Sequence, residues 1–140
     1  MSPIDPFSVQ PGEFLQAVGF RLDEIDPAEV AAKGVTGEID VDERHHTPWG
    51  VVHGGVWATV VESAASVGAS LAVRDRGEFA VGVDNVTDFL RPVRRGRIRV
   101  IARAEQIGRS MQLWQVDLTD EQGKTVARGR VRLANQKLPE

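Results

Sequence analysis

The feature that most restricts the fold of this chain is a stretch from Val51 to Val73 in which only His53 and Glu62 can ionise. Val, Ala, Gly and Ser make up most of it. The stretch is long enough to cross a bilayer, but a central carboxylate is costly in hydrocarbon, and many of the other residues are small rather than strongly apolar. We therefore expect a long buried helix inside a globular domain, with no membrane span.

The 140 residues suit one domain with a sizeable core. Residues 1–10 predict an N-terminal arm, because they show little hydrophobic periodicity, and residues 11–140 predict a single domain. The segment from Pro11 to Val18, followed by a glycine, is typical of a short helix. The segment from Phe20 to Val41 predicts two strands around a bend near Asp26.

The last part of the chain is typical of strands, because β-branched and apolar residues lie there between turn signals. Alternation of charged and apolar residues is clearest from Arg97 to Val100 and from Arg128 to Leu133. Four strands are expected, at Phe79–Leu90, Arg97–Ile107, Met111–Thr119 and Thr125–Ala134. Strands, one long helix and four more strands predict an α+β fold, an antiparallel β-sheet wrapped around a central α-helix.

The composition excludes several classes of protein. With no cysteine, the chain cannot form disulfides, Cys-based zinc sites or thiol nucleophiles, and this fits a reducing compartment. The segment from Met1 to Phe7 lacks the basic and apolar regions of a secretory signal, so a cytoplasmic protein is expected. The pattern of a P-loop or of a dinucleotide-binding turn is also missing.

Charge is unevenly distributed along the chain. Residues 1–90 contain 5 basic and 15 acidic side chains, whereas residues 91–140 contain 12 basic and 5 acidic ones. The basic half allows an anionic ligand, but no nucleic acid is expected, because aromatic residues do not interleave with the arginines. Arg91 and Arg109 lie near expected turns, where guanidinium groups can meet a phosphate; the strand arginines are interpreted as a solvated face.

Glu62 is the first candidate for chemistry, because a carboxylate in an apolar helix must be partnered, protonated or poised for function. The alternative is a helix face that reaches solvent. His53, Gly54 and Gly55 stand where the helix should begin, and free N–H groups at a helix start favour developing negative charge. This pattern favours an oxyanion site.

Gly54 and Glu62 are separated by about 12 Å along a helix, at 1.5 Å per residue. A single carbonyl cannot reach both residues of the same helix. If both act on one substrate, they come from two subunits, and a homodimer with two shared sites is expected. Ser66, one turn after Glu62, is a candidate to hold the carboxylate or a water, or alternatively a small packing residue. His45, His46 and His53 lack the spacing of a common metal site, so no metal is expected.

Four motifs together resemble the hot-dog-fold thioesterases of the PaaI-like family, and most closely the 4-hydroxybenzoyl-CoA thioesterase branch with a catalytic Glu. They are Thr47–Gly55 (TPWGVVHGG), Glu62, Asp88–Val93 (DFLRPV) and Gly108–Ser110 (GRS). The similarity runs from about residue 15 to 135. It implies a hot-dog fold, hydrolysis of acyl-CoA or acyl-carrier thioesters at a subunit interface, and homodimers that assemble to homotetramers. No cofactor is implied beyond the CoA of the substrate.

The resemblance also implies roles for individual residues. Glu62 would be the base or nucleophile, Gly54 would present its amide to the thioester oxygen, and His53 would orient or hydrogen-bond near the thioester. Substrate contacts would come from Gly55, Thr47, His46 and Ser66, and CoA contacts from Arg91, Arg109 and Ser110.

Thr47 departs from the family pattern, because relatives commonly have Asn or Gln six residues before the motif histidine. Either Thr47 or His46 replaces the missing amide, or activity is weak; His45 and His46 could equally be exposed loop residues. Two functions other than hydrolysis therefore stay open. One is a non-catalytic acyl-CoA or acyl-carrier binding protein, and the other, less favoured, is a hydratase of 2-enoyl thioesters.

Overall fold

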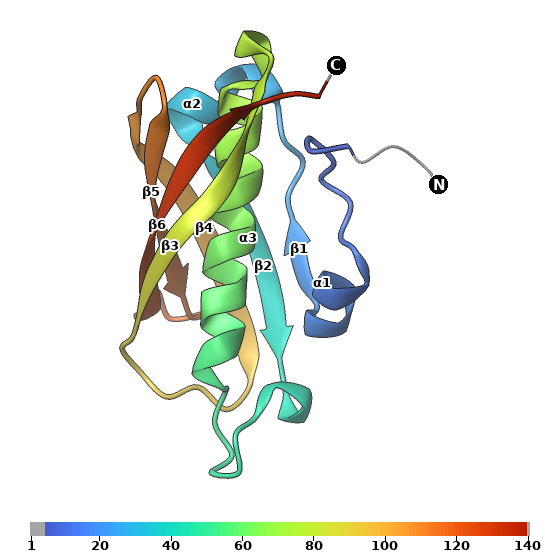
Figure 1. Cartoon of the computed structure of the whole chain (residues 1–140). Coiled ribbons are helices and arrows are strands. Elements are labelled where there is room, and N and C mark those ends of the chain that lie inside the picture. Colours follow the sequence, from blue (N-terminus) through green and yellow to red (C-terminus); the bar gives the residue numbers. More distant parts are fainter. Residues whose placement is uncertain (1–4, 140) are drawn as a thin grey trace.

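Helix α3 (Gly54–Ala72) is the element around which the other elements are arranged (Figure 1). The structure is a computed structural model that describes residues 5–139. Small residues on α3 let the strands approach closely, and a Cβ at Gly68 would come within 2.6 Å of the Trp114 ring. The predicted long buried helix is confirmed. Its buried residues are Trp57, Val60, Val61, Ala64, Ala65, Gly68, Ala69, Ser70 and Leu71.

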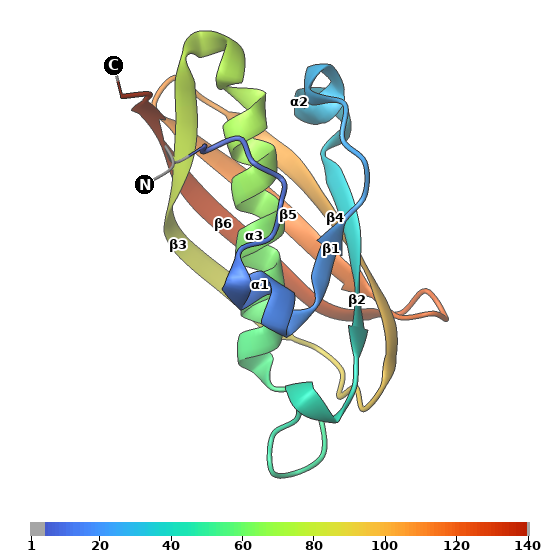
Figure 2. The same cartoon turned by 90° about the vertical axis from the view of Figure 1, so that its right-hand side faces the viewer.

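Six antiparallel strands form one sheet, in the order β1-β2-β4-β5-β6-β3, that curls around α3 (Figure 2). The apolar inner face of the sheet packs on the helix and makes the core. The predicted fold class, an antiparallel sheet wrapped around a central helix, is confirmed. The strands are β1 (Phe20–Leu22), β2 (Val35–Val41), β3 (Glu78–Phe89), β4 (Gly96–Ile107), β5 (Met111–Thr119) and β6 (Thr125–Lys137).

The four predicted C-terminal strands are confirmed to within three residues at each end. The largest difference is at β6, which continues to Lys137 through three polar residues beyond Ala134. These residues pair with the start of β3, where Lys137 lies opposite Glu78. The extension therefore depends on a neighbouring strand rather than on hydrophobic alternation, which is why the sequence pattern ended too early.

Between β1 and β2, the predicted bend contains two short helical turns that the sequence analysis missed. Asp26 caps a 3-10 turn at Pro27–Glu29 by accepting a hydrogen bond from the backbone of Ala28, and α2 (Val30–Lys33) follows. A helix of four residues is too short to show a helical periodicity. The two predicted strands on either side are confirmed as β1 and β2.

The outer face of the sheet carries a ladder of ion pairs. In β2, Glu38 and Asp40 lie opposite Arg99 and Arg97 of β4. Arg97 Nε donates to Asp40 at 2.8 Å, and this bond, together with that from Arg21, lowers the pKa of the Asp40 carboxyl to about 2. The acidic and basic halves of the chain thus meet in the sheet, as expected for a solvated face.

The N-terminal segment packs beside the first strands. Residues 1–4 of the predicted arm lie outside the described residues; in the described part of it, Phe7 packs against the core. The predicted short helix is α1 (Glu13–Val18), and it ends at Gly19 with a φ of 88°. Within residues 5–139, no helix combines the length and the apolar character that a membrane crossing requires.

Candidate active site

Backbone hydrogen bonds fix the loop that leads into α3. The Thr47 N–H donates to the carbonyl of Val51 at 2.7 Å and closes the turn around Trp49. The next residues are tied to two other segments, because Val52 N donates to the Val93 carbonyl and His53 N to that of His45, both at 2.8 Å. The start of α3 is therefore held in place from two sides.

His53 caps the helix with its side chain. Its Nδ1 accepts the Gly55 N–H at 2.8 Å, so the neutral ring carries its proton on Nε2. The ring is exposed. The Gly55 N–H is used by this cap, and a Cβ at Gly55 would come within 2.9 Å of His53 Nδ1, so the glycine lets the ring approach the backbone.

Gly54 is the first residue of α3, and its backbone N–H takes no part in the cap made by His53. Within residues 5–139, no acceptor receives a hydrogen bond from this group. A Cβ at Gly54 would collide with the ring of Phe89, which covers the glycine. A hollow of about 200 Å³ opens beside it and is lined by Val51, Val52, Trp57, Phe89, Leu90, Arg91 and Pro92. Gly54 itself lines this hollow, whose lining is mostly apolar.

Glu62 lies half-buried two turns further along α3. Ser66 Oγ donates to its Oε2 at 3.0 Å, so the contact expected from their spacing is present. On the other side the carboxylate lies against Gly82 of β3, where a Cβ would come within 2.7 Å of Oε2. The carboxylate is therefore held between a hydroxyl and a bare stretch of backbone.

Gly82 is a site residue that the sequence analysis missed. A glycine isolated within a strand pattern is a known sign of a bulge or of close backbone approach. Here the register of β3 with β6 does shift, between Gly82 and Asp84. That sign was available in the sequence, but its meaning depended on knowing that Glu62 lies opposite.

One chain does not bring all the candidate residues together. Gly54 and Glu62 lie on the same helix, about 12 Å apart along its axis. Arg91 adjoins the hollow at the start of α3, whereas the Arg109–Ser110 turn lies near the end of α3 (Figure 1). Both arginines are exposed and, in the described part of the chain, neither forms an ion pair. They cannot bind the same group of one ligand within one chain.

The residues that could replace the missing amide have other contacts. Thr47 Oγ1 accepts the Trp49 N–H at 3.2 Å, which leaves the hydroxyl proton available. His46 Nε2 donates to the carbonyl of Arg94 at 2.7 Å and is committed to that segment. The alternative that His45 is an exposed loop residue is wrong: it is 4% exposed, and its Nε2 donates to the Val18 carbonyl at 2.6 Å.

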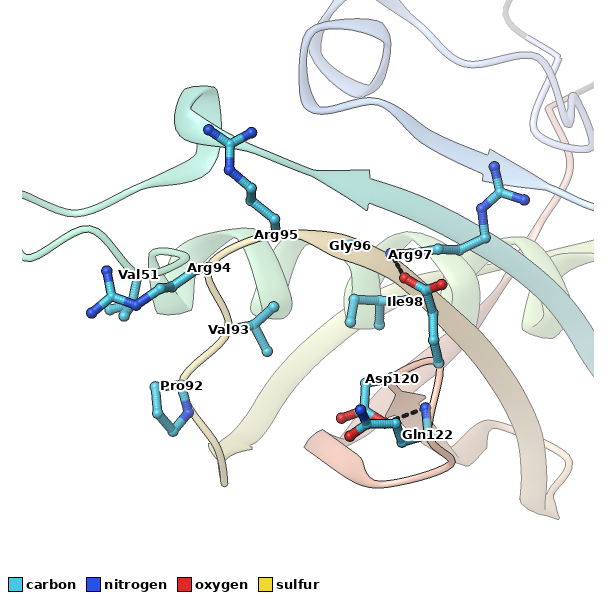
Figure 3. A pocket seen from close by; sticks show the side chains of 11 residues that line it. Val51, Pro92, Val93, Arg94, Arg95, Gly96, Arg97, Ile98, Asp120 and Gln122 are labelled. Atoms are coloured by element: carbon cyan, nitrogen blue, oxygen red, sulfur yellow. Dashed lines mark hydrogen bonds between the residues drawn. The ribbon is translucent and has the colours of Figure 1, made fainter.

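A larger hollow than the one beside Gly54 lies elsewhere. It has a volume of about 680 Å³ and lies between residues 92–98 and the β5–β6 turn, with Val51 at its edge. In Figure 3 the side chains of Arg95 and Arg97 extend away from Asp120 and Gln122, which lie on the other side of the strand that carries the arginines. Neither Glu62 nor Gly54 lines it. The candidate chemistry is therefore not located there.

Comparisons with known proteins show the family of this chain. The family model of the Thioesterase superfamily matches residues 50–127. Rv1847 of Mycobacterium tuberculosis is 38% identical over 124 residues, which are 87% of this chain and 85% of the relative. The solved structure of that protein gives a TM-score of 0.83, with 91% of this chain and 98% of that one covered.

Two further relatives have names that state a reaction. The 1,4-dihydroxy-2-naphthoyl-CoA hydrolase of Listeria monocytogenes is 33% identical over 100 residues, 71% of this chain and 80% of its own. The crystal structure of thioesterase HI1161 from Haemophilus influenzae is 30% identical with a TM-score of 0.81, and the match covers 91% of this chain and 85% of that one.

Proposed function

Because this chain belongs to the thioesterase superfamily and has its hot-dog fold, we propose that it hydrolyses acyl-CoA thioesters with Gly54 and Glu62 as its catalytic groups. The Gly54 N–H polarises the thioester carbonyl. Glu62 either activates water or attacks the carbonyl carbon. The products are a free acid and CoA.

The observation that carries this proposal is the unused N–H of Gly54 at the start of α3. The first N–H groups of a helix have no partner within it, and the helix dipole adds partial positive charge there. A donor of this kind stabilises the oxyanion that forms when a thioester is attacked. The apolar hollow beside it would exclude water from the acyl chain and strengthen the interaction.

Glu62 has the surroundings of a general base or a nucleophile. The Ser66 hydroxyl at 3.0 Å fixes one carboxylate oxygen, which leaves the other free for a water or a carbonyl carbon. Attack by Glu62 itself would give a mixed anhydride, whose hydrolysis leaves an oxygen from water in the carboxylate. Under single turnover in H₂¹⁸O, label in Glu62 would indicate the anhydride route with water attacking the glutamyl carbon, and label only in the product acid would count against that route.

Each complete site would combine two subunits. β3 is an outer strand of 12 residues, and three apolar side chains along it, Val81, Val83 and Val86, are exposed by 45%, 58% and 63%. A long apolar edge of this kind is seldom left uncovered in nature. Antiparallel pairing of two β3 strands would run the two α3 helices in opposite directions and bring Glu62 of one toward Gly54 of the other.

Assembly of two such dimers into a homotetramer, and a location in the cytoplasm, are further parts of the proposal. The location is supported by the cysteine-free composition. Arg91, Arg109 and Ser110 are proposed to bind the nucleotide end of CoA. Since Arg91 and the Arg109 turn lie at opposite ends of α3, they would reach one CoA from different subunits.

A thiol-release assay tests the proposal. The panel contains benzoyl-CoA, 1,4-dihydroxy-2-naphthoyl-CoA and aliphatic acyl-CoAs of increasing length, because the name of the Listeria relative points to an aromatic acyl group. Release of CoA above the uncatalysed rate is expected for at least one of them. Stabilisation of the protein by acyl-CoA without thiol release would instead support a binding protein. Thr47, which stands where relatives commonly have Asn or Gln, favours this alternative. Loss of crotonyl-CoA absorbance without thiol release would support a hydratase.

A further inference from the structure

Among the described residues, the most completely buried of the polar side chains His45, Ser70 and Gln112 is Gln112, at the second residue of β5. Gln112 is 1% exposed on the inner face of the sheet, where the next inward residues are Trp114, Val116 and Leu118. An amide in an apolar core is tolerated only if its hydrogen bonds are made. The hydrogen-bond partners of Gln112 therefore indicate its role in the structure.

All of the polar atoms of Gln112 are used. Nε2 donates to the carbonyl of Ala69 at 3.0 Å and to Asn135 Oδ1 at 2.8 Å, and Oε1 accepts from Trp114 Nε1 at 2.8 Å. The Ala69 carbonyl belongs to the last turn of α3, whose carbonyls have no partner within the helix. Gln112 thus joins the end of α3 to Asn135 on β6.

Asn135 in turn holds the turn between β4 and β5. Its Nδ2 donates to the carbonyls of Gly108 and Arg109, both at 3.1 Å, and its backbone N–H donates to the carbonyl of Ser110 at 2.8 Å. Three successive carbonyls therefore point toward one residue. Arg76 adds a fourth bond, from Nη1 to the Gly108 carbonyl at 2.9 Å.

The direction of these carbonyls determines the direction of the N–H groups. A trans peptide is planar, so its N–H points opposite to its C=O. With the carbonyls of Gly108 and Arg109 held inward, the N–H groups of Arg109 and Ser110 point outward, and no residue from 5 to 139 accepts them. Adjacent outward N–H groups form a concavity that suits an anion. A hollow of about 320 Å³ adjoins the turn.

We infer that Gln112 and Asn135 are positioning residues that hold the Arg109–Ser110 turn in the conformation that binds a phosphate of CoA. The inference rests on the proposed function. It assigns a role to two residues that touch neither the thioester nor the nucleotide. They act by keeping three carbonyls inward, so that two N–H groups and the Arg109 guanidinium face the ligand together.

The experiment compares two variants of the same buried chain of hydrogen bonds. N135A removes the two side-chain bonds to the turn, those to the carbonyls of Gly108 and Arg109, whereas W114F removes the bond at the opposite end, from Trp114 Nε1 to Gln112 Oε1, and leaves the turn intact. Each variant is assayed with benzoyl-CoA and with S-benzoylpantetheine, which lacks the nucleotide. The Kd of free CoA is measured by calorimetry, so that one readout does not depend on turnover.

For N135A we expect the KM of benzoyl-CoA and the Kd of CoA to rise about tenfold, the effect of losing one to two hydrogen bonds to the ligand. Its kcat, and both constants for S-benzoylpantetheine, stay within about twofold of the parent. W114F lowers thermal stability but leaves the Kd of CoA unchanged. N135T, which keeps one donor, gives an intermediate Kd and carries the test if N135A does not fold.

Equal CoA affinity in the parent protein and N135A would overturn the inference. A loss that extends equally to S-benzoylpantetheine or to W114F would overturn it too, because a purely structural role predicts that result. The proposed function fails in a different way. In that case the parent protein itself neither binds free CoA nor releases thiol from any member of the acyl-CoA panel.

Discussion

The backbone of Gly82 on β3 lies directly against the carboxylate of Glu62 on α3, so that a Cβ at this position would stand 2.7 Å from Oε2. Ser66 holds the same oxygen from the other side at 3.0 Å. A bulge in β3 immediately follows, between Gly82 and Asp84. The position of the proposed catalytic carboxylate is thus set partly by a side chain that is missing from a neighbouring strand.

The substitution G82A tests this relationship. The added methyl group would overlap the carboxylate of Glu62, which ends a flexible side chain. The carboxylate is therefore displaced, and strand β3 can keep its position. We expect kcat to fall by about a hundredfold, as a displacement of about 1 Å can cause, with a Tm within about 2 °C of the parent. G12A is the matched control, because a Cβ at Gly12 meets no atom within 4 Å. An unchanged kcat in G82A would contradict the assigned position of the carboxylate.

Replacement of the carboxylate itself gives a second prediction. E62Q keeps the shape and still accepts the Ser66 hydroxyl, but it cannot take a proton or attack a carbonyl. We expect turnover to fall by about 10³-fold or more while the fold is retained. S66A should cost much less, about tenfold, because the carboxylate remains and only its orientation loosens. Near-normal rates in E62Q, measured with circular dichroism as a check of folding, would remove Glu62 from the mechanism.

The Gly54 N–H can be deleted without removing the helix. Proline is well tolerated at the first position of a helix, and His53, with φ −65° and ψ 133°, already has the backbone that a residue before proline needs. We expect G54P to lower kcat by about 10²- to 10³-fold through loss of the donor. G54A is the control, since it adds a Cβ against Phe89 but keeps the N–H. If both variants lose the same activity, crowding rather than the donor explains the loss.

A shared site predicts that two inactive variants restore activity to each other. Mixing subunits of E62Q and G54P forms heterodimers in which one site carries both substitutions and the other carries neither. After unfolding and refolding together, about a quarter of all sites should be intact if subunits associate at random. The thiol-release rate of the mixture measures this directly. A mixture as inactive as its components would contradict the dimer proposal.

The ion-pair ladder predicts the response to acid. Hydrogen bonds from Arg97 and Arg21 lower the pKa of Asp40 from its usual 3.8 to about 2. A carboxyl with a lowered pKa stabilises the folded state above its unfolded pKa and loses that contribution as the pH falls through the folded value. Stability should therefore decline between about pH 4 and pH 2, and Asp23, whose pKa Arg99 also lowers, adds to the decline.

The substitution D40N should reduce the loss of stability as the pH falls. Urea midpoints measured at intervals from pH 5 to pH 2 test this. At neutral pH the change should be small, because the Asp40 side chain is 48% exposed and screened by water. D75N serves as the control. It removes an exposed carboxylate that takes part in no ion pair of the described residues, and it should leave the slope unchanged.

The sequence predicted most of the fold because its elements have strong periodic signals. The long stretch of small and apolar residues predicted α3, and alternation with turn residues predicted the four C-terminal strands within three residues. The spacing of Glu62 and Ser66 made a contact between them one of two open interpretations, since four residues make about one helical turn, and the contact is present. Local patterns were sufficient wherever the determining interactions are local.

The remaining features depend on contacts between distant segments. That Gly82 lies against Glu62, that His45 is buried on the carbonyl of Val18, and that Gln112 belongs to the core are results of how the sheet curls around α3. No local pattern encodes these contacts. The separation of Arg91 from Arg109 is of the same kind, because two loops that are close in sequence lie at opposite ends of the helix.

The uneven charge of the two halves of the chain affects the register in which strands β2 and β4 pair. Hydrophobic alternation forbids a slip of one residue between β2 and β4 but would accept a slip of two, which keeps the same faces inward. In the observed alignment Glu38 faces Arg99 and Asp40 faces Arg97; if Asp40 faced Arg99 instead, Glu38 would lie beside Ile101. The segregated charges therefore disfavour a slip in this direction, which burial alone would permit.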